Sequence, residues 1–146
     1  MSEHTANIIW NRHTQDFTYD SYNRDHEWAF KDIKVPASAA PDFKGNPDHV
    51  DPEQAFVAAL SSCHMLTFLA IAAKQKFIVD SYEDNAVGYL EKNAQGKLAM
   101  TRVILRPHIQ FADNKIPSSD ELKEMHNKAH HNCFIANSIT TDVTIE

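Results

Sequence analysis

Hydrophobic and polar residues alternate along much of the chain, and one long apolar run interrupts this pattern. The segments NIIW (7–10) and FTYD (17–20) are short and rich in residues that favour strands, so they predict a hairpin closed by the polar residues between them. A second turn is expected at YNRDHEW (22–28). The three prolines and one glycine of 35–50 predict a long loop.

The apolar run at 55–73 predicts the first long helix. Asp51 suits the N-cap, Pro52 suits the first helical position, and Gln54 occupies the capping-box position three residues later. The helix is expected to continue to about Lys76. Two serines and a histidine at its centre make it a poor membrane span, so we expect a helix that is buried on nearly all sides and no membrane partner.

The C-terminal half predicts a hairpin, a second helix and a last strand. Residues 87–111 form the hairpin around 93–96, and its second arm has the alternation of a half-buried antiparallel strand. Ser118 and Glu121 make a capping-box pair for the second helix, and 140–146 alternates like a final strand. The expected core positions are Val103, Leu105, Ile109 and Phe111 in the strand arm and Leu122, Met125, Ala129 and Cys133 in the helix.

This order of elements indicates an α+β fold in one domain, 1–146, with antiparallel sheets around a central helix. One sheet and one short helix cannot cover a helix that is apolar on all sides. A second copy of the chain is the simplest cover, so the pattern predicts a homodimer.

Composition narrows the function classes. The net charge is −6 and no cluster of lysine and arginine offsets it, so a nucleic-acid partner is not expected. The N-terminus lacks the pattern of a secretory signal and there are two cysteines, which predicts a cytoplasmic protein. No phosphate-binding loop is apparent, so no nucleotide or flavin cofactor is expected.

Nine histidines raise the question of a metal site. His126 and His130 are four residues apart on the second predicted helix, a spacing that allows chelation. No acidic residue or cysteine completes a ligand set, so a solvated helix face is the preferred interpretation and no metal is expected.

Cys63 and Cys133 are the only cysteines, and each falls on the core-facing side of its predicted helix. Buried cysteine is often no more than a small hydrophobic residue. Two packed helices could also bring the thiols within disulfide reach, as an attacking and a resolving thiol require. The residues alone leave both interpretations open.

Two segments resemble the signatures of the OsmC/Ohr family of hydroperoxide reductases. DPEQAFVAALSSCHML (51–66) resembles the family's central helix, and AHHNCFIANSI (129–139) resembles its second cysteine motif. The N-terminal FTYDSYNRDHEWAF and VPASAAPDF also fit an OsmC-like subgroup. The resemblance implies the OsmC-like fold, in which antiparallel sheets wrap a buried central helix in an intertwined homodimer.

The resemblance also implies a thiol-dependent peroxidase for organic hydroperoxides and possible use of hydrogen peroxide, without a cofactor. Cys63 corresponds to the peroxidatic cysteine, Cys133 to the resolving one, and Glu53 to the family's glutamate. Arg24 corresponds to its arginine, with Arg12 as the competitor. An external dithiol, with a lipoyl-type dithiol among the candidates, would reduce the disulfide.

One residue departs from the family's pattern, and two alternative functions stay open. Phe134 follows Cys133 where many family members have proline, which bears on how fast the disulfide forms. The alternative functions are a non-catalytic protein that binds a small ligand and a redox-sensing stress protein. For a peroxidase, an apolar pocket near Cys63 is expected from Phe56, Leu60, Leu66 and Phe68 or from the same residues of a second copy.

Overall fold

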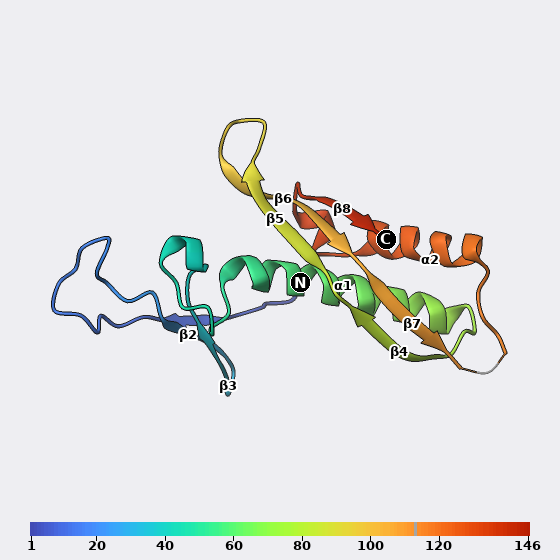
Figure 1. The fold of residues 1–146 in the computed structure, drawn as a ribbon. Coiled ribbons are helices and arrows are strands. Elements are labelled where there is room, and N and C mark those ends of the chain that lie inside the picture. Colours follow the sequence, from blue (N-terminus) through green and yellow to red (C-terminus); the bar gives the residue numbers. More distant parts are fainter. Residues whose placement is uncertain (113) are drawn as a thin grey trace. The chain divides into compact units, whose positions relative to one another are not determined.

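The computed structural model describes residues 1–112 and 114–146. The chain forms two compact units, Met1–Ala55 and Phe56–Glu146, and the division falls within the long helix α1 (Pro52–Lys74). Each unit is described separately below, and Figure 1 shows the elements that belong to each.

The first unit contains an antiparallel sheet of β1 (Asn7–Ile9), β2 (His26–Phe30) and β3 (Ile33–Ala37), in that order. The predicted hairpin between 7–10 and 17–20 is therefore wrong, because β1 pairs with β2. Residues 18–22 turn instead: the Ser21 hydroxyl accepts the Thr18 backbone N–H, and the Thr18 carbonyl accepts two backbone N–H groups. Such local bonds compete with strand pairing.

The prediction of a loop over 35–50 is wrong for its first three residues, because 35–37 belong to β3. Pro36 lies in this strand. A proline is tolerated there because β3 is at the edge of the sheet, where a missing backbone N–H removes no hydrogen bond between strands. The remainder is loop with a short 3-10 helix, η1 (Pro41–Phe43). Backbone hydrogen bonds of 2.9 Å and 3.2 Å join Val50 to Ser38 and Pro36 and close the loop on itself.

The second unit holds two sheets. β4 (Val79–Asp84) pairs with β7 (Pro107–Phe111), while β5 (Val87–Lys92), β6 (Leu98–Leu105) and β8 (Asp142–Ile145) form the other, with β8 parallel to β6. In Figure 1 the strands β4, β5 and β7 run obliquely across α1.

The hairpin around 93–96 is confirmed, but its second arm is two strands and β4 was missed. The arm breaks at Arg106, whose backbone N–H donates to the Asp84 carboxylate at 2.6 Å. The polar sequence of β4, VDSYED, conceals the alternation that marks a strand.

Both helix starts have the predicted caps. At α1, Asp51 accepts the Gln54 N–H at 2.8 Å and the Gln54 side chain accepts the Asp51 N–H at 3.0 Å. At α2 (Ser119–Asn132), Ser118 and Glu121 make the same reciprocal pair at 3.1 Å. Two reciprocal bonds satisfy backbone donors that have no partner within the helix.

The core of the second unit is divided into two apolar clusters. α1 supplies Phe68 and Ala72 to one cluster, with Met125 and Ala129 of α2, and supplies Leu60 to the other. The strands pack against α1 closely at Gly88, where an added Cβ would lie 2.5 Å from the Val57 side chain. The buried core of both clusters comprises Leu60, Phe68, Ala72, Phe77, Val103, Leu105, Met125, Ala129 and Cys133.

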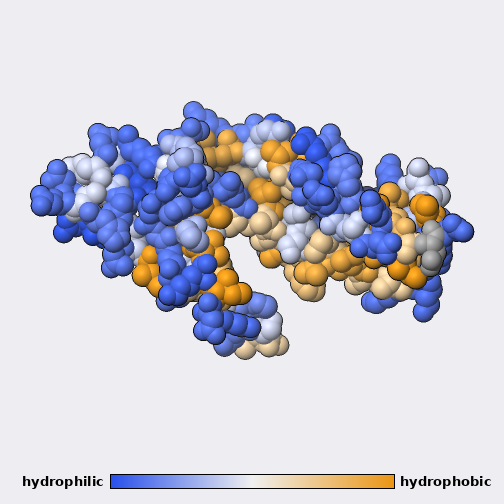
Figure 2. Space-filling model, turned by 60° about the horizontal axis from the view of Figure 1, so that its bottom comes forward, coloured by the Kyte–Doolittle hydropathy of each residue, from blue (hydrophilic) through white to orange (hydrophobic). Residues whose placement is uncertain are grey.

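Within one chain, α1 buries a single stripe rather than its whole surface. The buried positions are Leu60, His64, Phe68 and Ala72, four residues apart. Leu66, on another face, is 61% exposed. Hydrophobic residues, orange in Figure 2, accordingly form patches on the molecular surface. The exposed positions of the helix include Ala58, Ala59, Ser62, Leu66, Ala70 and Ala73.

By length and composition alone, α1 is long and apolar enough to cross a membrane. The core helix of a soluble protein passes the same test, and α1 has core residues in both apolar clusters. The α+β prediction is confirmed by this arrangement of two helices and mixed sheets.

Candidate functional site

The fold brings the two cysteines together. Cys63 lies on α1 and Cys133 is the C-cap residue of α2, and both thiols are free. They share one apolar cluster with Leu60, Val103 and Leu105. Burial, and then the neighbouring Cys63 thiol, raise the pKa of Cys133. Residues 70 positions apart in the sequence are thus neighbours in space.

The two thiols differ in their surroundings. Cys133 is fully buried, whereas Cys63 is partly exposed. Burial and the nearby Cys63 thiol act on the pKa of Cys133 in the same upward direction, while the Ala136 backbone N–H, which donates to its sulfur at 3.4 Å, acts in the opposite direction. Cys133 is therefore held as a neutral thiol at neutral pH, and Cys63 is the thiol open to solvent.

The chain leaves α2 at Cys133 without a proline. The φ and ψ angles of Cys133, −72° and 116°, are extended, and Phe134 is 81% exposed. The Asn137 backbone N–H donates to the Cys133 carbonyl at 3.0 Å, and the Ser138 hydroxyl donates to the Phe134 carbonyl at 2.8 Å. These hydrogen bonds fix the turn into η2 (Ala136–Ser138).

Arg24 lies in the first unit, just before β2. Its guanidinium donates to the Tyr22 carbonyl at 2.6 Å and to the Tyr19 carbonyl at 2.5 Å, and its central carbon is 3.6 Å from the centroid of the Tyr22 ring. Glu53 lies in the first turn of α1 and is half-buried. Within the single chain, no ion pair joins Glu53 to Arg24 or to any other residue that the structure describes.

Arg12 has a different environment. It is exposed and donates to the carbonyls of Thr14 and Gln15, the second at 2.8 Å. Arg24 is half-buried and lines a cavity with aromatic walls, whereas Arg12 does not line it. Of the two candidates, Arg24 is the one next to space that a small molecule can enter.

A buried histidine pair corrects the prediction of a solvated helix face. His64 and His126 are only 1% and 8% exposed, and their rings stack with Nε2 of His64 at 3.0 Å from Nδ1 of His126. Burial, His126 and His130 lower the pKa of His64 to about 4, against the opposing effect of Asp84. Burial likewise lowers the pKa of His126.

This pair could have been found from the sequence. His64 is in register with Leu60 and Phe68, four residues on either side, which marks it as a core position of α1. Among the residues that the structure describes, no group of three histidine, cysteine or acidic side chains is placed to hold a metal ion.

Within one chain, the residues proposed for an apolar pocket near Cys63 do not all lie together, and a pocket shared with a second copy stays a prediction. Leu60 and Phe68 are fully buried in two different clusters, and Leu66 is largely exposed. The cavity with aromatic walls lies in the first unit, around Arg24.

Comparisons with known proteins agree with this geometry. The family model of the OsmC-like proteins matches residues 45–146. An OsmC-like protein of unknown function from Vibrio cholerae is 51% identical, with 100% of this chain and 99% of that chain covered and a TM-score of 0.95. No curated protein matches the chain.

More distant structures share the fold. An organic hydroperoxide resistance protein, OsmC, from Legionella pneumophila is 19% identical, with 99% and 97% of the two chains covered and a TM-score of 0.71. An organic hydroperoxide resistance protein from Elizabethkingia anophelis is 16% identical, with coverage of 99% and 97% and a TM-score of 0.70. The fold and the pair of cysteines define an α+β protein of the OsmC class. The chain belongs to the OsmC-like family.

Proposed function

We propose that this protein is a thiol-dependent peroxidase that reduces organic hydroperoxides, with Cys63 as the attacking thiol and Cys133 as the resolving thiol. The observation that carries the proposal is the contact between the only two cysteines, one partly exposed and one fully buried. Two proteins that share the fold are described as organic hydroperoxide resistance proteins, which supports the choice of substrate.

The difference in burial between the two thiols supports this order of steps. A peroxide from solvent reaches the partly exposed Cys63 first, and its thiolate attacks one peroxide oxygen. The O–O bond breaks, Cys63 becomes a sulfenic acid, and the alkoxide takes a proton to leave as an alcohol. Sulfur is oxidised by two electrons and the peroxide is reduced by two.

Cys133 is suited to the second step because it is already beside Cys63. Its sulfur attacks the sulfenic acid sulfur, the S–O bond breaks, and its proton leaves with the oxygen as water. The products of the cycle are one disulfide, one alcohol and one water. An external dithiol, of the lipoyl type among others, returns the disulfide to two thiols by exchange.

Arg24 and Glu53 are assigned to the support of the thiolate. A thiol in apolar surroundings is a weak nucleophile unless a cation offsets its desolvation, and an arginine keeps its charge in any protein environment. We assign this charge to Arg24, with Glu53 holding the guanidinium fork, in a homodimer formed by the exposed face of α1. A cytoplasmic location provides the reducing conditions that the cycle needs.

A single-turnover assay tests the proposal. Reduced protein is mixed with a small excess of cumene hydroperoxide, peroxide and free thiols are counted, and peptide mapping locates the disulfide. The proposal predicts the loss of one peroxide and two thiols per chain, with Cys63 linked to Cys133.

Two variants assign the roles. Cys63→Ser abolishes peroxide loss, while Cys133→Ser consumes one equivalent and leaves a sulfenic acid at Cys63 that dimedone traps. If peroxide survives with the wild-type protein, the enzyme proposal fails and a ligand-binding or sensing role takes its place. If Cys133→Ser is inert and Cys63→Ser reacts, the roles are reversed.

A further inference from the structure

A cavity of about 590 Å³ lies in the second unit, between the elements that Figure 1 labels α2, β7 and β8. Its volume falls within the ~300–1,000 Å³ that is usual for small-molecule sites. All of its lining residues belong to the second unit, and neither Cys63 nor Cys133 is among them. The thiol chemistry proposed above therefore gives this cavity no role.

The strands supply an apolar wall. Pro107, Ile109 and Phe111 alternate along β7, so they lie on one face of the strand over about 14 Å. Val143 and Ile145 of β8 extend this wall. All five side chains are only half-buried within the chain. An alkyl chain laid along the wall would remove apolar surface from water, which favours binding.

The helix α2 supplies hydrogen-bond donors and a positive charge. Lys123 and His126 are three residues apart, so they are neighbours on the helix surface, with about 5–6 Å between their Cβ atoms. Lys123 forms an ion pair with no carboxylate that the structure describes. The carboxylate of Glu146 also lines the cavity, but it pairs with Arg106 at 2.6 Å. The charge of Lys123 is therefore uncompensated.

The buried histidine pair makes His126 a donor towards a ligand. Nδ1 of His64 is buried and has no hydrogen-bond partner among the described residues, and a buried N–H without an acceptor is costly. The proton of His64 therefore lies on Nε2, which donates to Nδ1 of His126 at 3.0 Å. Because Nδ1 of His126 accepts, the neutral ring of His126 carries its own proton on Nε2.

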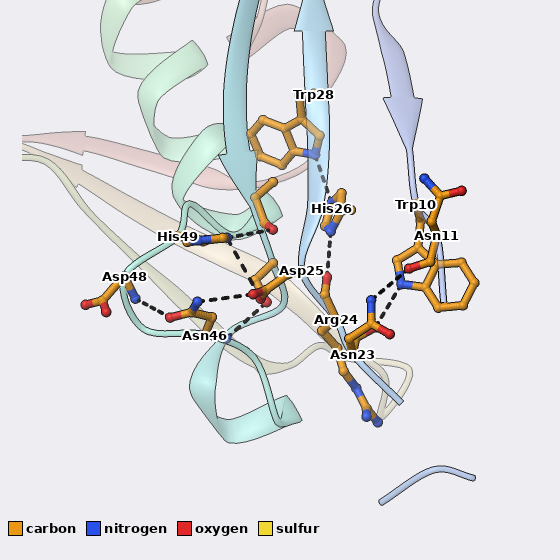
Figure 3. Close-up of polar contacts among 12 residues, drawn as sticks. Trp10, Asn11, Asn23, Arg24, Asp25, His26, Trp28, Asn46, Asp48 and His49 are labelled. Carbon is orange, nitrogen blue, oxygen red and sulfur yellow. Dashed lines mark hydrogen bonds and ion pairs between the residues drawn. The ribbon is translucent and has the colours of Figure 1, made fainter. Parts of the chain in front are cut away.

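This donor has no acceptor within the described part of the chain. Polar side chains of the first unit pair with each other, as the Asn46 amide does with the Asp25 carboxylate at 3.2 Å (Figure 3). His126 is only 8% exposed, yet its Nε2 donates to no residue that the structure describes. Buried polar groups normally have partners. An acceptor with a negative charge would satisfy Nε2 and also complement Lys123.

We propose that this cavity binds a medium-chain aliphatic acid, with its carboxylate at Lys123 and His126 and its alkyl chain along β7. The two carboxylate oxygens can accept from the ammonium group and from Nε2 at the same time. An aliphatic alcohol lacks the charge that Lys123 complements, and acetate lacks the chain. The inference goes beyond the proposed peroxidase function and does not depend on it.

Calorimetric titration tests the inference, with decanoate as the probe and with 1-decanol and acetate as the partial ligands. The proteins are wild type, Lys123→Met and Lys128→Met. Lys128 is an exposed lysine of the same helix that pairs with Glu124 at 3.4 Å and does not line the cavity. We expect one decanoate per chain, with a Kd about fivefold higher in Lys123→Met and unchanged in Lys128→Met. Decanol should bind more weakly than decanoate, and acetate should show no saturable binding.

Nuclear magnetic resonance of protein with ¹⁵N-labelled histidine rings locates the ligand. The ring nitrogens of His126 should report a proton on Nε2, and their signals should shift on addition of decanoate, while those of the exposed His4 should not. A proton on Nδ1 of His126, no saturable decanoate binding, or the same Kd in wild type and Lys123→Met would each overturn the inference. No peroxide is present in either experiment, so these results leave the peroxidase proposal untouched.

Discussion

The two units of the chain are built on different principles. The second unit buries twelve of the residues that the structure describes there, and nine of these, Cys133 among them, form two apolar clusters. In the first unit only Ala37, Ser38 and Asp51 are buried, and its loops are held by hydrogen bonds between side chains and backbone. The two thiols therefore lie in the unit with the apolar clusters, and Arg24 lies in the unit that is held by polar and aromatic contacts.

The largest predicted difference between the units concerns packing. Phe68→Ala removes a fully buried ring of the second unit and should lower the free energy of unfolding by about 3–5 kcal/mol. Phe17→Ala removes a ring that is 64% exposed in the first unit and should change it by less than about 1 kcal/mol. Urea unfolding followed by circular dichroism measures both. Equal losses would contradict the contrast.

The buried histidine pair predicts a pH dependence of stability. The pKa of His64 is lowered from 6.5 to about 4, so the unfolded chain binds more protons than the folded one between these values. Stability is complete above pH 6.5 and falls as the pH falls towards 4, by up to about 3 kcal/mol. Urea midpoints at pH 7, 5.5 and 4.5 measure this effect.

A variant isolates the contribution of this pair. His64→Gln removes the titrating group and should flatten the pH profile, whereas His4→Gln, at an exposed position, should leave it as in wild type. An unchanged slope in His64→Gln would assign the acid sensitivity to other groups.

The smallest predicted effect is the loss of stability when either helix loses its capping side chain. Ser118→Ala and Asp51→Ala each remove one half of a capping box and should cost about 1 kcal/mol. Ser2→Ala changes a serine in the exposed N-terminal segment and is the control. Thermal unfolding of the three variants ranks the costs. If neither cap variant is less stable than Ser2→Ala, water replaces the lost hydrogen bonds and the caps do not stabilise the helices.

The sequence predicted what depends on local chemistry. The capping residues predicted where both helices begin. The three- and four-residue spacing of apolar residues in α2 predicted that Met125, Ala129 and Cys133 lie on its buried face. The roles of the two cysteines come from the family resemblance alone and stay a prediction, whereas their shared apolar cluster follows from the packing of the second unit.

What the sequence did not predict depends on contacts between distant segments. β1 pairs with β2 because residues 18–22 satisfy their hydrogen bonds locally, and β4 is polar enough to hide its period. The residues that line the cavity around Arg24 are spread from Trp10 to Pro52, so no single sequence motif could predict it. His126 appeared solvated only because its partner, His64, lies 62 residues away.

The most direct test of the account asks whether the thiol of the second unit depends on the cation of the first. In a Cys133→Ser background only Cys63 reacts, and iodoacetamide reports how readily its thiolate forms. The account predicts that Arg24→Met slows alkylation at pH 7 by at least about tenfold, since a loss of ~1.4 kcal/mol in thiolate stabilisation has that effect. Arg12→Met should leave the rate unchanged. Equal rates in Arg24→Met and the parent protein would contradict the account, and a loss in Arg12→Met alone would move the role to that residue.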